Sequence, residues 1–155
     1  MRRPIKKRRA KEPDIKYASL LVARFISQVM KKGRKSIAMR IVYGALESLE
    51  KKLNKPALEI LDAAMENAGP NLELRSRRIG GANYQVPYEV SADRRMVLTV
   101  RWIVTAAMSQ KGKPMKDKLA EEIINAVNNT GIAVKKKQDT HRMADANKAF
   151  AHFAW

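Results

Sequence analysis

The fold of this chain is organised around residues 75–90, which read RSRRIGGANYQVPYEV. Together with the lead-in from Leu72, this is the only stretch whose side chains clearly alternate with period two. Two alternating runs joined by Gly-Gly-Ala-Asn at residues 80–83 predict a β-hairpin. Pro87 has no N–H to donate to a ladder, so its strand should be an edge and the hairpin should have two strands. We therefore expect a two-stranded arm at about residues 72–90.

The predicted arm needs support from elsewhere, because an isolated two-stranded hairpin is marginally stable in water. Apolar side chains gather at its base, namely Leu72, Leu74, Tyr88 and Val90. Its tip carries Arg, Gly, Asn and Tyr instead. This distribution predicts an arm that is rooted in a body and reaches into something polyanionic.

Helical periodicity dominates the rest of the sequence. Apolar residues three and four apart, with turn residues between the runs, predict helices over about residues 17–32, 36–53, 56–68, 91–110, 115–128 and 134–150. The last helix would start at three lysines, 135–137, whose charge opposes the helix macrodipole. They are either an anion-binding helix start or a solvated charge run. Without an internal repeat or a strong boundary, the chain is expected to be mostly α, a single domain of about six helices with an inserted two-stranded β-hairpin arm.

The charge of the chain indicates its kind of partner. The 155 residues include 32 Lys and Arg against 15 Asp and Glu, for a net charge of +17. Residues 2–11 hold seven of the bases and no acid, yet the remainder still carries +10. Such an excess indicates a nucleic acid first and an anionic membrane second. Residues 1–13 are expected to form a basic N-terminal tail and residues 14–155 the helical domain. The tail is either a solvated, disordered segment or an arm that orders on contact with phosphate.

The residues that catalysis, metal binding or membrane insertion would need are missing. The absence of cysteine excludes disulfides and thiolate metal sites, and His141 and His152 are too far apart to share a metal. No apolar run approaches the ~18 residues of a membrane span. Neither a nucleophile elbow nor a phosphate-binding glycine loop occurs. We expect no enzyme activity, no cofactor, no metal and no membrane association.

Basic side chains on many separate predicted elements point to phosphate and ribose binding. The candidates are Arg2, Arg3, Lys6, Lys7, Arg8, Arg9, Lys11, Lys31, Lys32, Arg34, Lys35, Arg75, Arg77, Arg78, Arg94, Arg95, Arg101 and Lys113. Their spread suits an irregular folded RNA better than one groove of a duplex. The alternative is an architectural DNA-binding protein with a β-arm, but the arm tip lacks the Pro or bulky apolar wedge of such proteins. Tyr84, beside the tip, either stacks on a base or packs across the arm.

Several segments together resemble a known family. The arm motif at residues 75–90 is the most specific, and the resemblance covers nearly the whole chain. The other segments are residues 33–35, 41–45, 101–102, 135–137, 142–147 and 151–155. They are similar to the bacterial form of the small-subunit ribosomal protein seven family.

The resemblance implies six helices with a hairpin between the third and fourth. It implies a non-catalytic constituent of the small subunit that binds its ribosomal RNA directly and nucleates assembly of the head (3′ major) domain. It also implies a place at the subunit interface near exit-site tRNA and mRNA, with ribosomal proteins nine and eleven as neighbours and without homo-oligomers. The residues implied to lie near tRNA and mRNA are Arg78, Gly80, Gly81, Ala82, Asn83, Tyr84, Lys135, Lys136 and Arg142. The expected location is a cytoplasmic ribosome, with an organellar ribosome left open.

Overall fold

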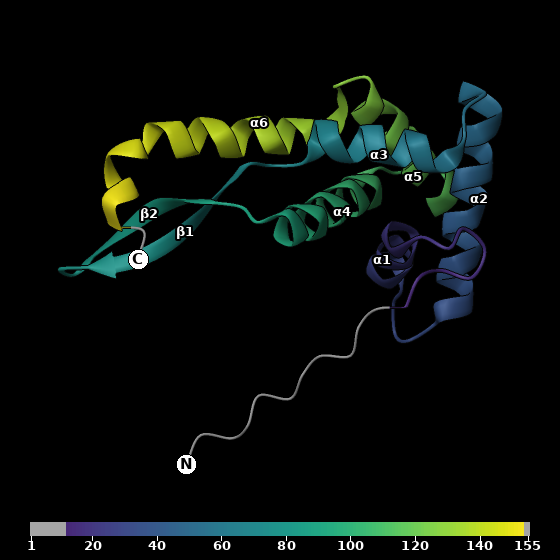
Figure 1. Ribbon diagram of the computed structural model, residues 1–155, viewed down its shortest axis with the longest axis horizontal. Coiled ribbons are helices and arrows are strands. Elements are labelled where there is room, and N and C mark those ends of the chain that lie inside the picture. The colour runs from purple at the N-terminus through teal and green to yellow at the C-terminus, as the bar shows by residue number, and fades with distance from the viewer. Residues whose placement is uncertain (1–11, 154–155) are drawn as a thin grey trace, which may run out of the picture.

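The structure, a computed structural model, describes residues 12–153 (Figure 1). The elements in chain order are α1 (Leu20–Val29), α2 (Lys35–Leu53), α3 (Ala57–Ala68), β1 (Leu72–Ile79), β2 (Ala82–Glu89), α4 (Ala92–Ser109), α5 (Met115–Val127), α6 (Gly131–Ala146) and a 3₁₀-helix, η1 (Lys148–Phe153). The predicted mostly α fold with an inserted two-stranded arm is confirmed. Helices α1–α5 form a helical body, and the arm (residues 72–89) and α6 extend away from it on the same side.

The helical body is held together by one hydrophobic core. Helix α5 packs against α2, α3 and α4, and α1 closes the bundle against α2 and α4. Its largest fully buried side chains include Phe25, Leu46, Leu61, Ile103 and Leu119. Each such side chain contributes roughly 1.5–3 kcal/mol of burial free energy. The helical spacing of these apolar residues is therefore the pattern that fixes the body.

The arm is a regular antiparallel pair closed by a tight turn. Ile79 pairs with Ala82, so the turn consists of Gly80 and Gly81 alone rather than the four residues expected. Their φ angles are +56° and +93°, in the region that favours glycine. Pro87 lies opposite Leu74 in a sheet that has only these two strands, as predicted.

The support that the arm needs comes from the C-terminal part of the chain. One face of the hairpin packs against α6 and η1, and Val86 on this face is fully buried. The Tyr84 ring lies 4.9 Å from the Phe150 ring and 5.9 Å from the Phe153 ring, centroid to centroid. Figure 1 shows η1 bending from the end of α6 toward the strands. The contacts of Tyr84 with Phe150 and Phe153 are called the aromatic brace below. The arm, α6 and η1, which this brace holds together outside the body, are called the arm unit.

Helix α6 begins three residues earlier than predicted, and this corrects the position of its lysines. Gly131 opens the helix with φ +93°, and a Cβ there would lie 3.0 Å from Oε1 of Glu122. That oxygen accepts the Ala133 N–H at 2.9 Å, so a buried carboxylate of α5 caps α6. Lysines 135–137 consequently lie in the second turn, and the expected conflict with the helix dipole does not arise. The predicted helix over residues 134–150 is in fact α6 followed by η1.

The cap is a carboxylate in an apolar setting. Desolvation raises the pKa of Glu122, and the hydrogen bonds from the backbone of Ala133 and Ile132 and from Gln110 offset this only in part. Since α5 belongs to the body and α6 to the arm unit, Glu122 is one of the links between the two.

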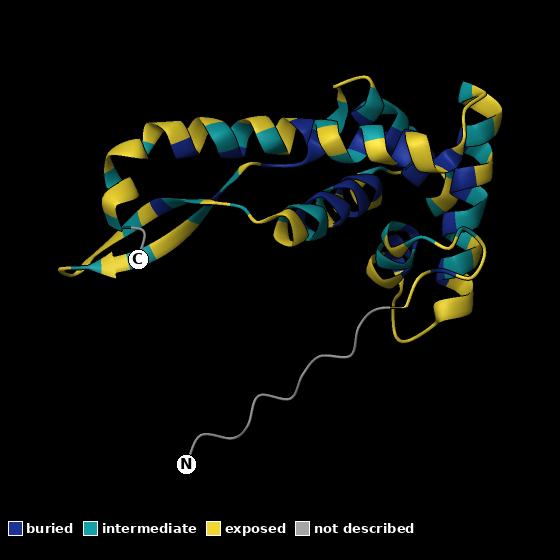
Figure 2. Cartoon of the chain, viewed as in Figure 1, coloured by how far each residue is buried: buried dark blue, intermediate teal, exposed yellow. Residues whose placement is uncertain are grey.

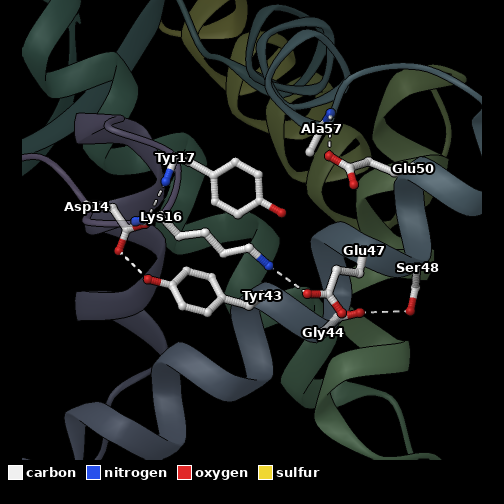
Figure 3. A network of polar contacts seen from close by, with 9 residues as sticks. All are labelled: Asp14, Lys16, Tyr17, Tyr43, Gly44, Glu47, Ser48, Glu50 and Ala57. Carbon is white, nitrogen blue, oxygen red and sulfur yellow. Dashed lines mark hydrogen bonds and ion pairs between the residues drawn. The ribbon is translucent and has the colours of Figure 1, made fainter.

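The described chain starts on a polar anchor that ties it to α2 (Figure 3). Buried Asp14 accepts the N–H groups of Lys16 and Tyr17 at 3.1 and 3.2 Å, and the Tyr43 hydroxyl at 2.7 Å. Burial and the bond to Asp14 raise the pKa of Tyr43 to about 12. The Lys16 ammonium ion reaches Glu47 at 2.6 Å and lies over both tyrosine rings. This anchor fixes the start of the described chain against α2.

Candidate nucleic-acid interface

Among residues 12–153, some candidate cations have partners inside the protein, and others are exposed without an ion pair to another described residue. The residues predicted in the N-terminal tail lie outside the described residues, namely Arg2, Arg3, Lys6, Lys7, Arg8, Arg9 and Lys11. The other candidates all lie within the described residues, on the arm, α2, α4 and α6 and in the loops before α2 and α5. Figure 2 shows exposed positions on the arm and on each of these helices.

Two arginines meet at Glu73 near the base of the arm. The Arg75 Nε donates to Oε1 of Glu73 at 2.8 Å, and the Arg94 Nε donates to Oε2 at 2.9 Å. Glu73 is only 8% exposed. Burial acts to raise its pKa, but the hydrogen bonds from the two guanidinium groups outweigh burial and lower it. This carboxylate therefore joins β1 to the start of α4 and orients both arginines.

The two faces of the arm present their arginines differently. The guanidinium carbons of Arg75 and Arg77 lie 4.9 and 5.8 Å from the centre of the Tyr88 ring, on the face that packs against α6. Arg78 is on the opposite face, paired with Asn83, and both are exposed. Arg78 has no hydrogen bond or ion pair with the described part of the chain. Packing thus immobilises one face of the arm, while the Arg78 face is available to a partner.

Two more cations are directed at the C-terminal end of α3. Lys137 Nζ donates to the carbonyl of Asn67 at 2.8 Å, and Arg95 donates to the carbonyl of Glu66 at 3.2 Å. Cations stabilise a helix C-terminus because its last carbonyl groups carry partial negative charge. Of the candidate set, Arg95 therefore has a structural role that its sequence position did not indicate.

His141 joins α6 to the same region. Its Nε2 accepts the Asn71 N–H at 3.1 Å, one residue before β1. Burial, followed by the charge of Lys137, lowers the pKa of His141, which favours the neutral form that can accept this bond. The imidazole thereby helps to fix the direction in which the arm leaves the body.

Within the described residues, the loop between α1 and α2 and the start of α2 carry a dense group of cations without an internal ion pair. Lys31, Lys32, Arg34 and Lys35 are all exposed. Lys32 and Gly33 have φ angles of +51° and +72°, so the chain turns tightly here. Helix α2 starts at this turn without a side-chain cap. Uncapped N–H groups with surrounding cations are typical of a phosphate-binding position. In Figure 1 this loop and the arm tip lie toward opposite ends of the molecule.

The remaining cationic candidates are exposed on two other helices and in the loop before α5. Arg101 lies on α4, and Lys135, Lys136 and Arg142 lie on α6. Lys113, before α5, forms an exposed ion pair with Glu121 at 2.5 Å. An exposed pair of this kind is worth little, so Lys113 can exchange Glu121 for a phosphate at small cost.

The aromatic brace is a feature that the sequence pattern did not predict as part of the site. Helical spacing alone puts Phe150 on the apolar side of a longer last helix and gives Phe153 no role. Tyr84 packs on these two rings, which is neither cross-strand packing nor base stacking. The spacing of two phenylalanines three residues apart near the end of the chain was the signal available, because it puts both rings on one side of a helical turn.

The described residues offer neither a metal site nor a membrane span. Among residues 12–153, no three His, Asp or Glu side chains lie close enough to hold a metal ion. Within the same part of the chain, no helix combines the length and apolarity needed to span a membrane.

Comparison with known proteins agrees with the resemblance seen in the sequence. The family described as Ribosomal protein S7p/S5e matches residues 1–148. The small ribosomal subunit protein uS7 of Thermotoga neapolitana is 56% identical over 155 residues, which is all of both chains. The uS7 protein of Thermotoga maritima is also 56% identical over 155 residues, all of both chains. The uS7 protein of Chloroflexus aggregans is 52% identical over 152 residues, 98% of this chain and 97% of that protein.

The Thermotoga relatives match the whole chain, and the family model, over residues 1–148, includes the body, the arm and α6 together. Membership of a ribosomal family means a structural constituent of the small subunit rather than an enzyme. Bacterial relatives at this identity also imply a cytoplasmic ribosome. The chain belongs to the S7p/S5e family of small-subunit ribosomal proteins.

Proposed function

We propose that this protein is a primary binder of small-subunit ribosomal RNA that nucleates folding of the head (3′ major) domain. The observation that carries the proposal is the division of its cations. Arg75, Arg94, Arg95 and Lys137 are bound internally and set the shape of the arm unit. The cations of the α1–α2 loop, with Arg78, Arg101, Lys135, Lys136 and Arg142, are exposed on surfaces that face different ways.

Such a distribution favours a folded RNA that encloses the protein over one duplex groove. Phosphate contacts supply most of the affinity of basic proteins for nucleic acid, and each contact releases counterions. Contacts made from several rigid surfaces would hold separate RNA helices in fixed relative positions. Holding helices in this way is what nucleation of a domain requires.

We further propose that the arm and α6 lie beside exit-site tRNA and mRNA, and that ribosomal proteins nine and eleven are neighbours. Arg78 and Asn83 point away from the packed face of the arm, beside the Gly80-Gly81 turn. The turn has no side chains of its own, so its backbone can approach a nucleic acid closely. On α6, Lys135, Lys136 and Arg142 are exposed as well.

The first experiment measures the salt dependence of binding to head-domain ribosomal RNA. Replacing Lys31, Lys32 and Arg34 by Ala should weaken binding, because phosphates that these side chains neutralise would keep their counterions. The slope of log K against log salt should fall by roughly 0.7–0.9 for each such phosphate. Triple replacement of Lys51, Lys52 and Lys55, which are exposed at the other end of α2, removes the same charge and is the matched control.

Equal losses in the two triple variants would mean that general charge attraction, not a defined interface, holds the RNA. Duplex DNA at matched salt is the competitor for the original chain. If it competes as well as head-domain RNA, the architectural DNA-binding alternative replaces the proposal.

The second experiment tests the arm separately in assembled subunits. Arg78→Ala should leave binding to head-domain RNA within about threefold but weaken retention of tRNA in the exit site. Arg101→Ala, an exposed arginine on α4, is the matched control. Unchanged tRNA retention in the Arg78 variant would place the arm elsewhere.

A further inference from the structure

One surface of this basic protein is unlike the rest, because helix α3 carries only negative charge. Its sequence ALEILDAAMENA contains Glu59, Asp62 and Glu66 and no Lys, Arg or His. Spacings of three and four place these acids on neighbouring turns of one side of the helix. In a chain with a net charge of +17, a helix of charge −3 cannot serve to attract phosphate.

A groove of about 740 Å³ runs alongside this helix, where α3, α4, α1 and the base of the arm meet. Apolar side chains supply much of its lining, namely Leu21, Met65, Leu72, Val90 and Met96. Three carboxylates also line it, Asp62 and Glu66 from α3 and Glu89 from the end of β2. The groove therefore combines an apolar lining with acids contributed from two sides.

The three carboxylates are exposed and have no ion pair with any residue of the described chain. One cation, Arg95, also lines the groove, but its guanidinium group donates to the Glu66 carbonyl. A phosphate group in this groove would be repelled by the three carboxylates that line it, since like charges repel even near a surface. An occupant that carries both cations and apolar side chains fits this groove, because its cations can pair with the carboxylates and its apolar side chains can contact the apolar lining.

We propose that this groove binds an extended segment of a neighbouring ribosomal protein in which Lys or Arg side chains alternate with apolar ones. An extended chain points successive side chains to opposite sides, so its apolar residues can enter the groove while its cations reach the acids. Neighbours of this kind are available, because proteins that share one RNA particle carry basic charge for the same reason as this chain does. In this proposal, the neighbouring protein binds at the groove, and the RNA binds at the cationic surfaces.

A binding experiment with the free protein tests the local chemistry. The probe is a short fluorescent peptide in which Lys and Val alternate, and anisotropy reports its binding to the full chain. The net charge of +17 repels this peptide, so any saturable binding has to come from a local acidic site. The double variant Asp62→Lys, Glu66→Lys should weaken the affinity about tenfold. The double variant Glu12→Lys, Asp145→Lys makes the same change of charge at exposed positions outside the groove and away from α3, and should leave the affinity nearly unchanged.

Absence of saturable binding, or equal weakening in the two double variants, would overturn the proposal. Each replaced side chain is exposed, so the variants should fold normally, and circular dichroism can verify this.

Cross-linking in assembled small subunits identifies the natural occupant. The chain has no cysteine, so Asp62→Cys provides a single attachment point for a benzophenone group. Mass spectrometry should find it joined to a protein segment in which basic and apolar residues alternate. Addition of Glu66→Lys to the same chain should reduce that product severalfold, and Glu59→Cys, one turn away on α3, should give much less of it. A cross-link to ribosomal RNA, to an acidic segment, or to no partner would overturn the proposal.

Discussion

The helical body and the arm are stabilised in different ways, although one chain of ordinary composition builds both. The body buries large apolar side chains from every one of its helices, such as Phe25 on α1 and Ile103 on α4. In β1 and β2 the buried side chains are Glu73 and Val86, one of them charged. The rest of the arm is steadied by rings and ion pairs at its edges.

The body is therefore stabilised by its own hydrophobic core, whereas the arm depends on packing against elements outside its two strands. Isolated hairpins are marginal, and here α6 and η1 provide the missing surface. An element that reaches into RNA has to expose polar side chains, so it cannot bury enough apolar area by itself. Changes in the body should therefore affect the whole protein, and changes in the arm unit should remain local.

The largest effect is expected for a truncation in the body. Leu61→Ala on α3 removes a fully buried side chain and should lower the free energy of unfolding by about 2–5 kcal/mol. Urea denaturation followed by circular dichroism measures it. Leu58→Ala on the same helix, at 36% exposure, is the control and should cost much less. Equal losses at the two positions would contradict the assignment of the core.

The next largest effect is expected at the link between body and arm unit. Glu122→Ala leaves the buried N–H of Ala133 without its acceptor, which should cost roughly 1–3 kcal/mol. Glu122→Gln keeps an acceptor oxygen and removes a charge that burial disfavours, so it should cost less. Amide hydrogen exchange should show the loss of protection first in the opening turns of α6. A uniform loss over all helices would mean that the cap is not specific to α6.

The Glu122 cap also shows which parts of the fold could be predicted from the sequence and which could not. The helices of the body and the two strands of the arm were predictable, because periods of 3.6 and two are local signals. The start of α6 was not, since its cap is a carboxylate eleven residues earlier on another helix. The position of the Glu122 carboxylate relative to Gly131 depends on how α5 packs against α6, and no local sequence pattern predicts that packing.

The candidate interface was predictable to the same degree. Basic clusters could be found by composition, and most of those that lie on described elements are exposed. Sequence alone did not separate Arg78, which is exposed and unpaired with the described residues, from Arg94 and Arg95, which have internal acceptors. That separation depends on the position of Glu73 and on the C-terminal end of α3, both brought near by tertiary packing.

A smaller and local effect is expected from the aromatic brace. Phe150→Ala removes the ring nearest to Tyr84, and aromatic pairs of this geometry contribute about 0.5–1.5 kcal/mol beyond burial. Amides of β1 and β2 should exchange faster, while the urea midpoint of the body changes little. Ile132→Ala, which truncates a half-exposed side chain at the other end of α6, is the control. If both variants left arm exchange unchanged, η1 would not be what steadies the arm.

The smallest effect is expected from titration of Glu73. Its pKa in the folded protein is lowered below the ordinary value of 4.5, so the ionised form adds stability that is fully present above about pH 4.5. That stability should be lost as the pH falls below 4.5 through the lowered pKa, because protonation removes the acceptor for Arg75 and Arg94. The effect is limited because both guanidinium groups are roughly half exposed and therefore solvent-screened.

Exchange of arm amides measured between pH 5 and pH 3, corrected for intrinsic rates, should show this dependence. Glu73→Gln cannot ionise, so it should already exchange faster at pH 5 and should show a flatter profile. A profile identical to that of the original chain would mean that the ion pairs at the base of the arm contribute nothing to its order.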